Sequence, residues 1–199
     1  MAKNVIIGQS GGPTAVINSS LAGVYKAACS LGADKVYGMQ YGIEGLLKEE
    51  MVELNVLFGD RMSIELLKRT PSSYLGSCRY KLPDPEADPA PFIKLFTLFD
   101  KYDICALFYI GGNDSMDTIA KLSRYGAKVG SSVRFIGVPK TIDNDLCLTD
   151  HTPGYGSAAK YIATILKEVI RDSSVYNIRS VTVAEIMGRH AGWLAGAAC

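Results

Sequence analysis

Short, continuous runs of hydrophobic residues recur along the chain and do not alternate with polar residues. Five such runs are rich in β-branched and aromatic residues: NVIIG (4–8), KVYGMQ (35–40), ICALFYI (104–110), VRFIGV (133–138) and SVTVAEI (180–186). Runs of this kind are typical of strands that are buried on both faces, as in a parallel sheet. We therefore expect five strands at these positions.

Between the runs, hydrophobic residues recur with the spacing of one helical face. The clearest case is the segment 157–171, whose charged residues fall on the opposite face. Its apolar positions are Ala158, Tyr161, Ile162, Ile165, Leu166, Val169 and Ile170. This spacing predicts an amphipathic helix. The segments 17–32 and 89–102 predict two further helices, and Gly32 is placed to end the first of them.

The alternation of strands and helices predicts an α/β fold, with a doubly wound, mostly parallel sheet and helices on both faces. The 199 residues suffice for one sizeable core. The segment 79–91 contains four prolines and three acidic residues, which predicts a surface loop, and no domain boundary is otherwise evident. The chain ends inside an apolar stretch, so we expect residues 1–199 to be a fragment of a longer protein. An apolar C-terminal helix packed on its own core is the alternative.

Composition excludes several classes of protein. The net charge of +1 argues against a nucleic-acid partner, and no apolar run approaches the ~20 residues needed to cross a membrane. The N-terminus lacks the long apolar region of a signal peptide. The five cysteines are scattered and form no CxxC pair, which favours reduced thiols over a zinc site or disulfides. We therefore expect a cytoplasmic protein.

Four loops, three of which contain glycine, each follow one of the expected strands. They are SGGPT (10–14), GGNDS (111–115), PKTIDND (139–145) and MGRHAG (187–192). Open α/β sheets bind ligands at the carboxyl ends of their strands, so a ligand site is favoured over four simple turns. Gly11 and Gly12 permit phosphate to approach backbone N–H groups, although the loop has no Walker spacing and no lysine.

The segment PKTIDND holds the strongest chemical signal. Asp143 and Asp145 are two residues apart, so one carboxylate could accept a hydroxyl proton while the other binds a sugar hydroxyl or a hydrated metal. Lys140 and Thr141 suit a phosphate group. The alternative is an Asx-rich turn with no role. The arginines Arg79 and Arg189 are further candidates for phosphate binding.

The segment GYGSAA (154–159) matches the GxGxxA pattern of dinucleotide-binding loops. No convincing strand precedes it, and no acidic residue lies about twenty positions further on as a partner for the ribose. A nicotinamide cofactor is therefore disfavoured.

Six segments in this order resemble the N-terminal portion of the phosphofructokinase family, and within it the pyrophosphate-dependent branch. They are SGGPTAVIN, LGSCR, GGNDS, PKTIDND, TPGYGSAAKYIA and EIMGRHAGWLA. The resemblance implies a longer subunit of two similar lobes, of which this chain is the phosphoryl-donor-binding one. It also implies reversible phosphoryl transfer from pyrophosphate to the 1-hydroxyl of fructose 6-phosphate, with Mg²⁺ as cofactor, in a homo-oligomer, specifically a dimer. An ATP-dependent sugar-phosphate kinase and an inactive phosphate-binding lobe are the alternatives.

The resemblance also implies roles for the matched positions. Asp143 would be the base that activates the sugar hydroxyl, and Arg189 would stabilise the transition state. Contacts to the substrate would come from Thr141, Ile142, Asp143, Asp145, Met187, Gly188 and Arg189. Contacts to pyrophosphate would come from Gly11, Gly12, Arg79, Asp114 and Lys140. Asn113 and Asp145 would lie at the metal.

Two matched positions bear on the choice of donor, since Asp114 and Lys140 stand where the ATP-dependent branch has glycines. The Asp114 carboxylate would take the space and charge of a nucleotide's α-phosphate. Two like charges about 4 Å apart cost ~1–4 kcal/mol, depending on the effective dielectric constant. We therefore expect Asp114 to select against ATP and to hold Lys140 beside pyrophosphate. Lys140 would then neutralise charge on the leaving phosphate. Asn113 replaces an aspartate of most family members, which predicts weaker magnesium binding.

Overall fold

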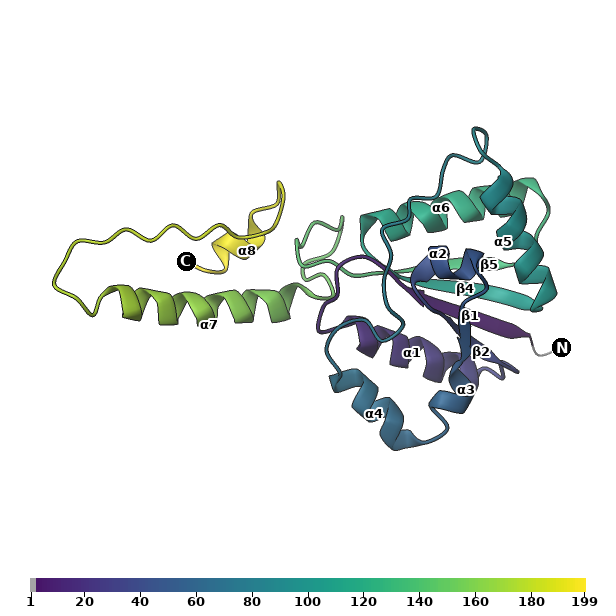
Figure 1. The fold of residues 1–199 in the computed structure, drawn as a ribbon, viewed down its shortest axis with the longest axis horizontal. Helices are drawn as coiled ribbons and strands as arrows, with labels where there is room; N and C mark the ends of the chain where they lie inside the picture. The colour runs from purple at the N-terminus through teal and green to yellow at the C-terminus, as the bar shows by residue number, and fades with distance from the viewer. Residues whose placement is uncertain (1–2) are drawn as a thin grey trace. The chain divides into compact units, whose positions relative to one another are not determined.

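The computed structural model describes residues 3–199, which form two compact units. The first unit ends at Pro139 and contains the sheet, and the second comprises Lys140–Cys199 (Figure 1). The sequence shows no sign of this division.

The first unit contains a five-stranded sheet in the order β3-β2-β1-β4-β5. The strands are β1 (Asn4–Gln9), β2 (Val36–Met39), β3 (Met51–Glu53), β4 (Ile104–Gly111) and β5 (Arg134–Pro139). All neighbouring pairs are parallel except β2 and β3, which are antiparallel. The expected mostly parallel α/β sheet is therefore confirmed. The strand order reverses between β1 and β4, and such a switch point opens a crevice at the carboxyl ends of the strands.

Helices cover both faces of the sheet (Figure 1). On one face lie α1 (Ile17–Ser30), α3 (Leu54–Leu57) and α4 (Arg61–Arg69), and on the other lie α2 (Gly42–Leu47), α5 (Ala90–Lys101) and α6 (Asn113–Lys128). Successive strand residues serve opposite faces: Val5 and Ile7 pack in one core cluster, and Ile6 packs in the other. This alternation explains why the strands are continuously hydrophobic.

Two of the three helices predicted from the sequence lie in this unit. The helix expected at 17–32 is α1, and Gly32 follows it with a φ of +80°. The helix expected at 89–102 is α5. The loop expected at 79–91 contains no helix or strand before Ala90. The short elements α2, α3, α4 and β3 were not predicted, and neither was the longer helix α6.

Leu107 of β4 provides a test of this core, because its side chain is fully buried in the cluster beneath α5. Leu107→Ala should lower the free energy of unfolding by about 2–5 kcal/mol, since it removes apolar contacts and leaves a cavity. Leu31→Ala is the matched control, because Leu31 is 88% exposed and its loss should change stability by less than about 0.5 kcal/mol. Denaturant unfolding measures both variants. Equal losses would contradict the burial of Leu107.

The second unit contains α7 (Tyr155–Ser173) and α8 (Trp193–Gly196). The helix expected at 157–171 is confirmed as α7, yet none of its residues is buried. Tyr161 and Ile170 on its apolar face are 67% and 62% exposed. The apolar face of α7 that the pattern predicts is therefore not covered by other residues of the second unit.

The strand expected at 180–186 is wrong, because the segment adopts no regular structure in this chain. Val181 and Val183 are 91% and 89% exposed. A strand forms only where a neighbouring strand supplies partners for its N–H and C=O groups. Among the described residues of the second unit, there is no strand that supplies them. Consequently MGRHAG does not follow a strand, although the other three loops do.

None of the helices within residues 3–199 combines the length and hydrophobicity needed to cross a membrane.

Candidate active site

The loop after β1 lies against the loop that carries Arg79. Ser77 Oγ donates a hydrogen bond to the Gly11 carbonyl at 2.7 Å, and Ser10 Oγ donates one to the Cys78 carbonyl at 3.3 Å. Gly11 has a φ of +77°, a backbone conformation that residues other than glycine rarely adopt. Two segments more than sixty residues apart are thereby joined, and both hold candidate pyrophosphate contacts.

The start of α6 completes this part of the site. A Cβ atom on Gly111 would lie 3.0 Å from the Ser10 carbonyl and closer still to the Ser115 side chain, so only glycine fits. The N-cap residue, Gly112, has no side chain to cap the helix. The N-terminal end of a helix has partial positive charge and unpaired N–H groups, which favour an anion. The predicted meeting of SGGPT and GGNDS at one edge of the sheet is therefore confirmed.

Asp114 lies in the first turn of α6 and forms an ion pair with Lys81, with Nζ and Oδ1 3.5 Å apart. Both side chains are largely exposed, so the pair contributes little to stability. The sequence analysis did not single out Lys81, although it lies two residues after Arg79. Asp114 belongs to the first unit and Lys140 to the second, so the pairing of these two residues stays a prediction.

In the second unit, hydrogen bonds within the segment 140–145 and to residues 150–152 hold this segment in place. The Asp143 N–H donates to Thr141 Oγ1 at 3.1 Å, and Thr152 Oγ1 donates to the Thr141 carbonyl at 2.9 Å. Asn144 has a φ of +57°, and its side chain bonds the backbone of Asp150 and Thr152. Asn144 therefore acts as a structural residue that shapes the loop.

Lys140 and Asp143 are buried, at 5% and 8% exposed. Burial lowers the pKa of Lys140 because it penalises the charged ammonium group, and the nearby Asp143 carboxylate opposes this effect. Arg189 Nε lies 3.6 Å from Asp143 Oδ2. The structure thus brings together two of the predicted catalytic groups, a protected carboxylate and an arginine whose side chain is 69% exposed.

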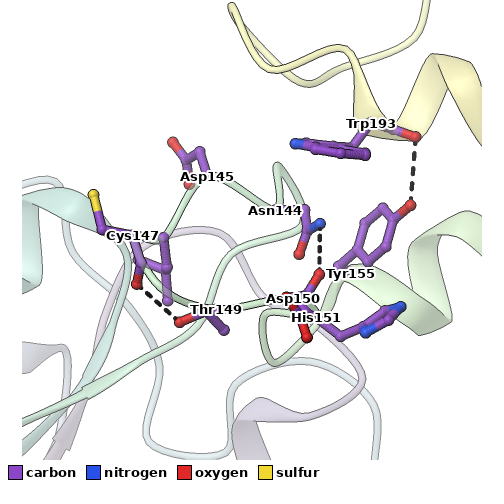
Figure 2. Close-up of a pocket in the computed structure, with 9 residues that line it drawn as sticks. Asn144, Asp145, Cys147, Thr149, Asp150, His151, Tyr155 and Trp193 are labelled. Atoms are coloured by element: carbon purple, nitrogen blue, oxygen red, sulfur yellow. Dashed lines mark hydrogen bonds between the residues drawn. The ribbon is translucent and has the colours of Figure 1, made fainter.

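A cavity of about 510 Å³ adjoins Asp145 in the second unit (Figure 2). Its other lining residues are Asn144, Leu146, Cys147, Thr149, Asp150, His151, Tyr155 and Trp193. The Tyr155 hydroxyl donates to the Trp193 carbonyl at 3.5 Å, which links the start of α7 to α8. In Figure 2 no hydrogen bond among the drawn residues engages the Asp145 carboxylate. Asp145 is exposed, so its carboxylate is accessible to a ligand.

The predicted site residues fall into two sets. The first unit carries Gly11, Gly12, Arg79, Asn113 and Asp114. The side chains of Arg79, Asn113 and Asp114 are exposed. The second unit carries Lys140, Thr141, Ile142, Asp143, Asp145, Met187, Gly188 and Arg189. Within residues 3–199, no group of three histidine, cysteine or acidic side chains is placed to hold a metal. Magnesium requires only one or two carboxylates beside water and phosphate, and the exposed carboxylate of Asp145 fits that mode of binding. Asn113 belongs to the first unit, so its place at the same ion stays a prediction.

Residues 4–199 match the family model described as Phosphofructokinase. The chain belongs to the phosphofructokinase family. The resemblance inferred from the six motifs is confirmed.

Relatives of known name support a narrower grouping within the phosphofructokinases. A protein of Halomonas elongata, named pyrophosphate–fructose 6-phosphate 1-phosphotransferase, is 45% identical over 98% of this chain and 47% of its own length. A protein of Methylococcus capsulatus with the same name is 42% identical over 98% of this chain and 47% of its own length. The crystal structure of a pyrophosphate-dependent phosphofructokinase from Nitrosospira multiformis superposes with a TM-score of 0.90, at 42% identity, over all of this chain and 49% of that one. The chain spans about half the length of these relatives.

Proposed function

We propose that the full-length protein transfers a phosphoryl group reversibly from pyrophosphate to the 1-hydroxyl of fructose 6-phosphate, giving fructose 1,6-bisphosphate and phosphate. The observation that carries this proposal is the carboxylate of Asp114 in the first turn of α6, between loops suited to phosphate. A negative charge there disfavours a nucleotide and tolerates the smaller donor. The names of relatives that are 42–45% identical support the same activity.

The second unit supplies the acid–base chemistry. Asp143 accepts the proton of the sugar 1-hydroxyl, and the oxygen of this hydroxyl attacks the nearer phosphorus of pyrophosphate. An O–P bond forms, the bridging P–O bond breaks, and the leaving phosphate keeps the electron pair. Arg189, 3.6 Å from Asp143, stabilises the negative charge on the transferring group, and Lys140 neutralises charge on the leaving phosphate. Thr141, Ile142, Met187 and Gly188 contact the sugar phosphate.

The first unit holds the donor. The backbone around Gly11 and Gly12 and the N-terminal end of α6 offer N–H groups to phosphate oxygens, and Arg79 offers a guanidinium group. Asp114 lies in the first turn of that helix and forms an ion pair with Lys81. Asp114 thereby selects the donor by charge and bulk.

Magnesium fits this site as the cofactor, because it neutralises charge on the phosphates of the donor. Asp145 supplies a carboxylate, and Asn113 supplies a neutral amide oxygen that can accept from a metal-bound water. We expect the ion to be required and weakly held.

Asn113→Asp should therefore lower the magnesium concentration needed for half-maximal activity, because it adds a charged ligand. The measurement is a magnesium titration of activity in the full-length protein, with calorimetry of magnesium binding in the presence of pyrophosphate. Ala120→Asp is the control, since it adds the same charge to an exposed position of α6 two turns away. An unchanged or greater requirement in Asn113→Asp would show that residue 113 lies outside the coordination sphere and its immediate surroundings.

The chain is proposed to be the N-terminal lobe of a two-lobed subunit. It spans about half the length of its relatives, and α7 leaves its apolar residues unburied. The full-length protein is expected to be a homodimer in the cytoplasm, in line with the sequence analysis.

Steady-state kinetics of the full-length protein with fructose 6-phosphate and either donor tests the proposal. We expect turnover with pyrophosphate and a value of kcat/KM for ATP at least about tenfold lower, from the repulsion at Asp114. Preferential use of ATP would instead establish the ATP-dependent kinase. Pyrophosphate binding without turnover of either donor would establish the inactive phosphate-binding lobe.

A further inference from the structure

Two buried amide side chains lie beneath the donor loops of the first unit. Gln9 is the last residue of β1 and Asn18 lies in the first turn of α1, and neither is exposed to solvent. Gln9 Nε2 donates to Asn18 Oδ1 at 2.9 Å and to the Ile17 carbonyl at 3.1 Å. Buried polar side chains are retained at a cost unless all of their hydrogen bonds are formed, so this pair calls for an explanation.

The remaining hydrogen-bond donors and acceptors of both amides bind one segment that is remote in the sequence. Gln9 Oε1 accepts from the Leu75 N–H at 2.8 Å and from Ser73 Oγ at 3.1 Å. Asn18 Oδ1 accepts from the Tyr74 N–H at 2.9 Å, and its Nδ2 donates to the Thr70 carbonyl at 2.9 Å. Residues 70–75 are thus tied to the end of β1 and the start of α1 by four hydrogen bonds.

This segment leads directly into the residues that face the glycine loop. Ser77 bonds the Gly11 carbonyl, and Ser10 bonds the Cys78 carbonyl. Arg79 comes next, and no residue within 3–199 forms an ion pair or hydrogen bond with its exposed guanidinium group. The location of Arg79 is therefore set by the backbone on either side of it. The following backbone is fixed by the buried Leu82, whose carbonyl accepts from Lys121 Nζ at 2.9 Å, and the preceding backbone is held by the two amides.

We propose that Gln9 and Asn18 are positioning residues of the donor site: they hold residues 70–79 against the glycine loop, so that Arg79 and the Gly11 backbone bind pyrophosphate together. Amides suit this task because each one donates and accepts at once. They also add no charge beneath a site for a highly charged anion. The inference rests on the proposed function, since it assigns the ligand of these loops.

Gln9→Glu tests the inference, because glutamate keeps the size of the side chain and cannot donate to Asn18 or to the Ile17 carbonyl. Since glutamate also adds a negative charge, the uncharged variant Ser73→Ala must change the KM for pyrophosphate in the same direction. In the full-length protein, we expect the KM for pyrophosphate to rise about ten- to a hundredfold, since small displacements of binding groups have large effects. The KM for fructose 6-phosphate should change less than about twofold, because the displaced groups serve the donor. Calorimetry with magnesium pyrophosphate should show the same loss of affinity.

Ser73→Ala is a milder variant, which removes a hydroxyl whose single proton is shared between Gln9 Oε1 and the Gly76 carbonyl. It should raise the KM for pyrophosphate about two- to fivefold, the factor that corresponds to one ordinary hydrogen bond. This variant decides the question if Gln9→Glu fails to fold.

Asn4→Ala is the matched control at the opposite end of β1. Asn4 also anchors remote backbone, since Nδ2 donates to the Tyr102 carbonyl at 2.8 Å and Oδ1 accepts from the Lys35 N–H at 3.1 Å. Its loss should lower the melting temperature and leave both KM values unchanged. If Gln9→Glu and Ser73→Ala change the KM for pyrophosphate no more than Asn4→Ala does, the amides are merely structural and the inference is wrong. If wild-type protein does not bind pyrophosphate, the proposed function fails as well.

Discussion

Asp143→Ser in the full-length protein should lower kcat by about 10²–10⁴-fold, because it removes the group that accepts the sugar hydroxyl proton. Asp143 is 8% exposed, its N–H is bonded to Thr141, and its carboxylate faces Arg189. Serine preserves the backbone hydrogen bond and lacks a basic group. The KM for fructose 6-phosphate should change little, since several other residues contact the sugar. Steady-state kinetics with both substrates measures these effects.

Asp172→Ser is the matched control for this variant, because Asp172 is an exposed aspartate at the end of α7. Its kcat should equal that of wild type within experimental error. Circular dichroism and thermal unfolding should show that both variants remain folded. A kcat of Asp143→Ser within a few-fold of wild type would remove Asp143 from the role of base.

Asp114→Gly should raise the affinity for ATP about five- to several-hundred-fold, since it removes a repulsion of ~1–4 kcal/mol against the α-phosphate. The same change should weaken the use of pyrophosphate, because the carboxylate that orders neighbouring lysines is lost. In the structure, the lysine paired with Asp114 is Lys81. Lys140 is the second lysine that we expect Asp114 to order. Kinetics of the full-length protein with each donor measures both effects.

Asp117→Gly is the matched control on the same helix. Asp117 is also exposed and forms an ion pair, with its Oδ2 2.7 Å from Lys121 Nζ. Glycine is a poorer helix former than aspartate at both positions, by about 0.3 kcal/mol, and both variants lose one negative charge. Only Asp114→Gly should change the choice of donor. If ATP stays as poor a donor and pyrophosphate as good a donor in that variant, Asp114 does not determine selectivity.

The sequence by itself determined the fold class and most of the elements that carry the site. The four strands β1, β2, β4 and β5 follow from continuous hydrophobic runs, and the helices α1, α5 and α7 follow from the helical spacing of their apolar residues. Three of the four candidate loops could be placed at strand ends, because the strands before them could be predicted. The family could be recognised because six motifs agree in order along the chain.

The structure decided the elements whose signals are short or non-local. The strand β3 has three residues and the helix α3 has four, which is too short for either to show a period. The strand expected at 180–186 failed for another reason, since strand propensity has no effect where no neighbouring strand supplies hydrogen bonds.

Only the tertiary structure decided which side chains meet. The contact of Ser77 with Gly11, the ion pair of Lys81 with Asp114 and the approach of Arg189 to Asp143 join residues 33–66 positions apart. The same holds for Gln9, whose two acceptor bonds lie 64 and 66 residues away. Local hydrophobic spacing reports which residues are buried and carries no information on such partners. They are determined by how the loops pack once the sheet has formed.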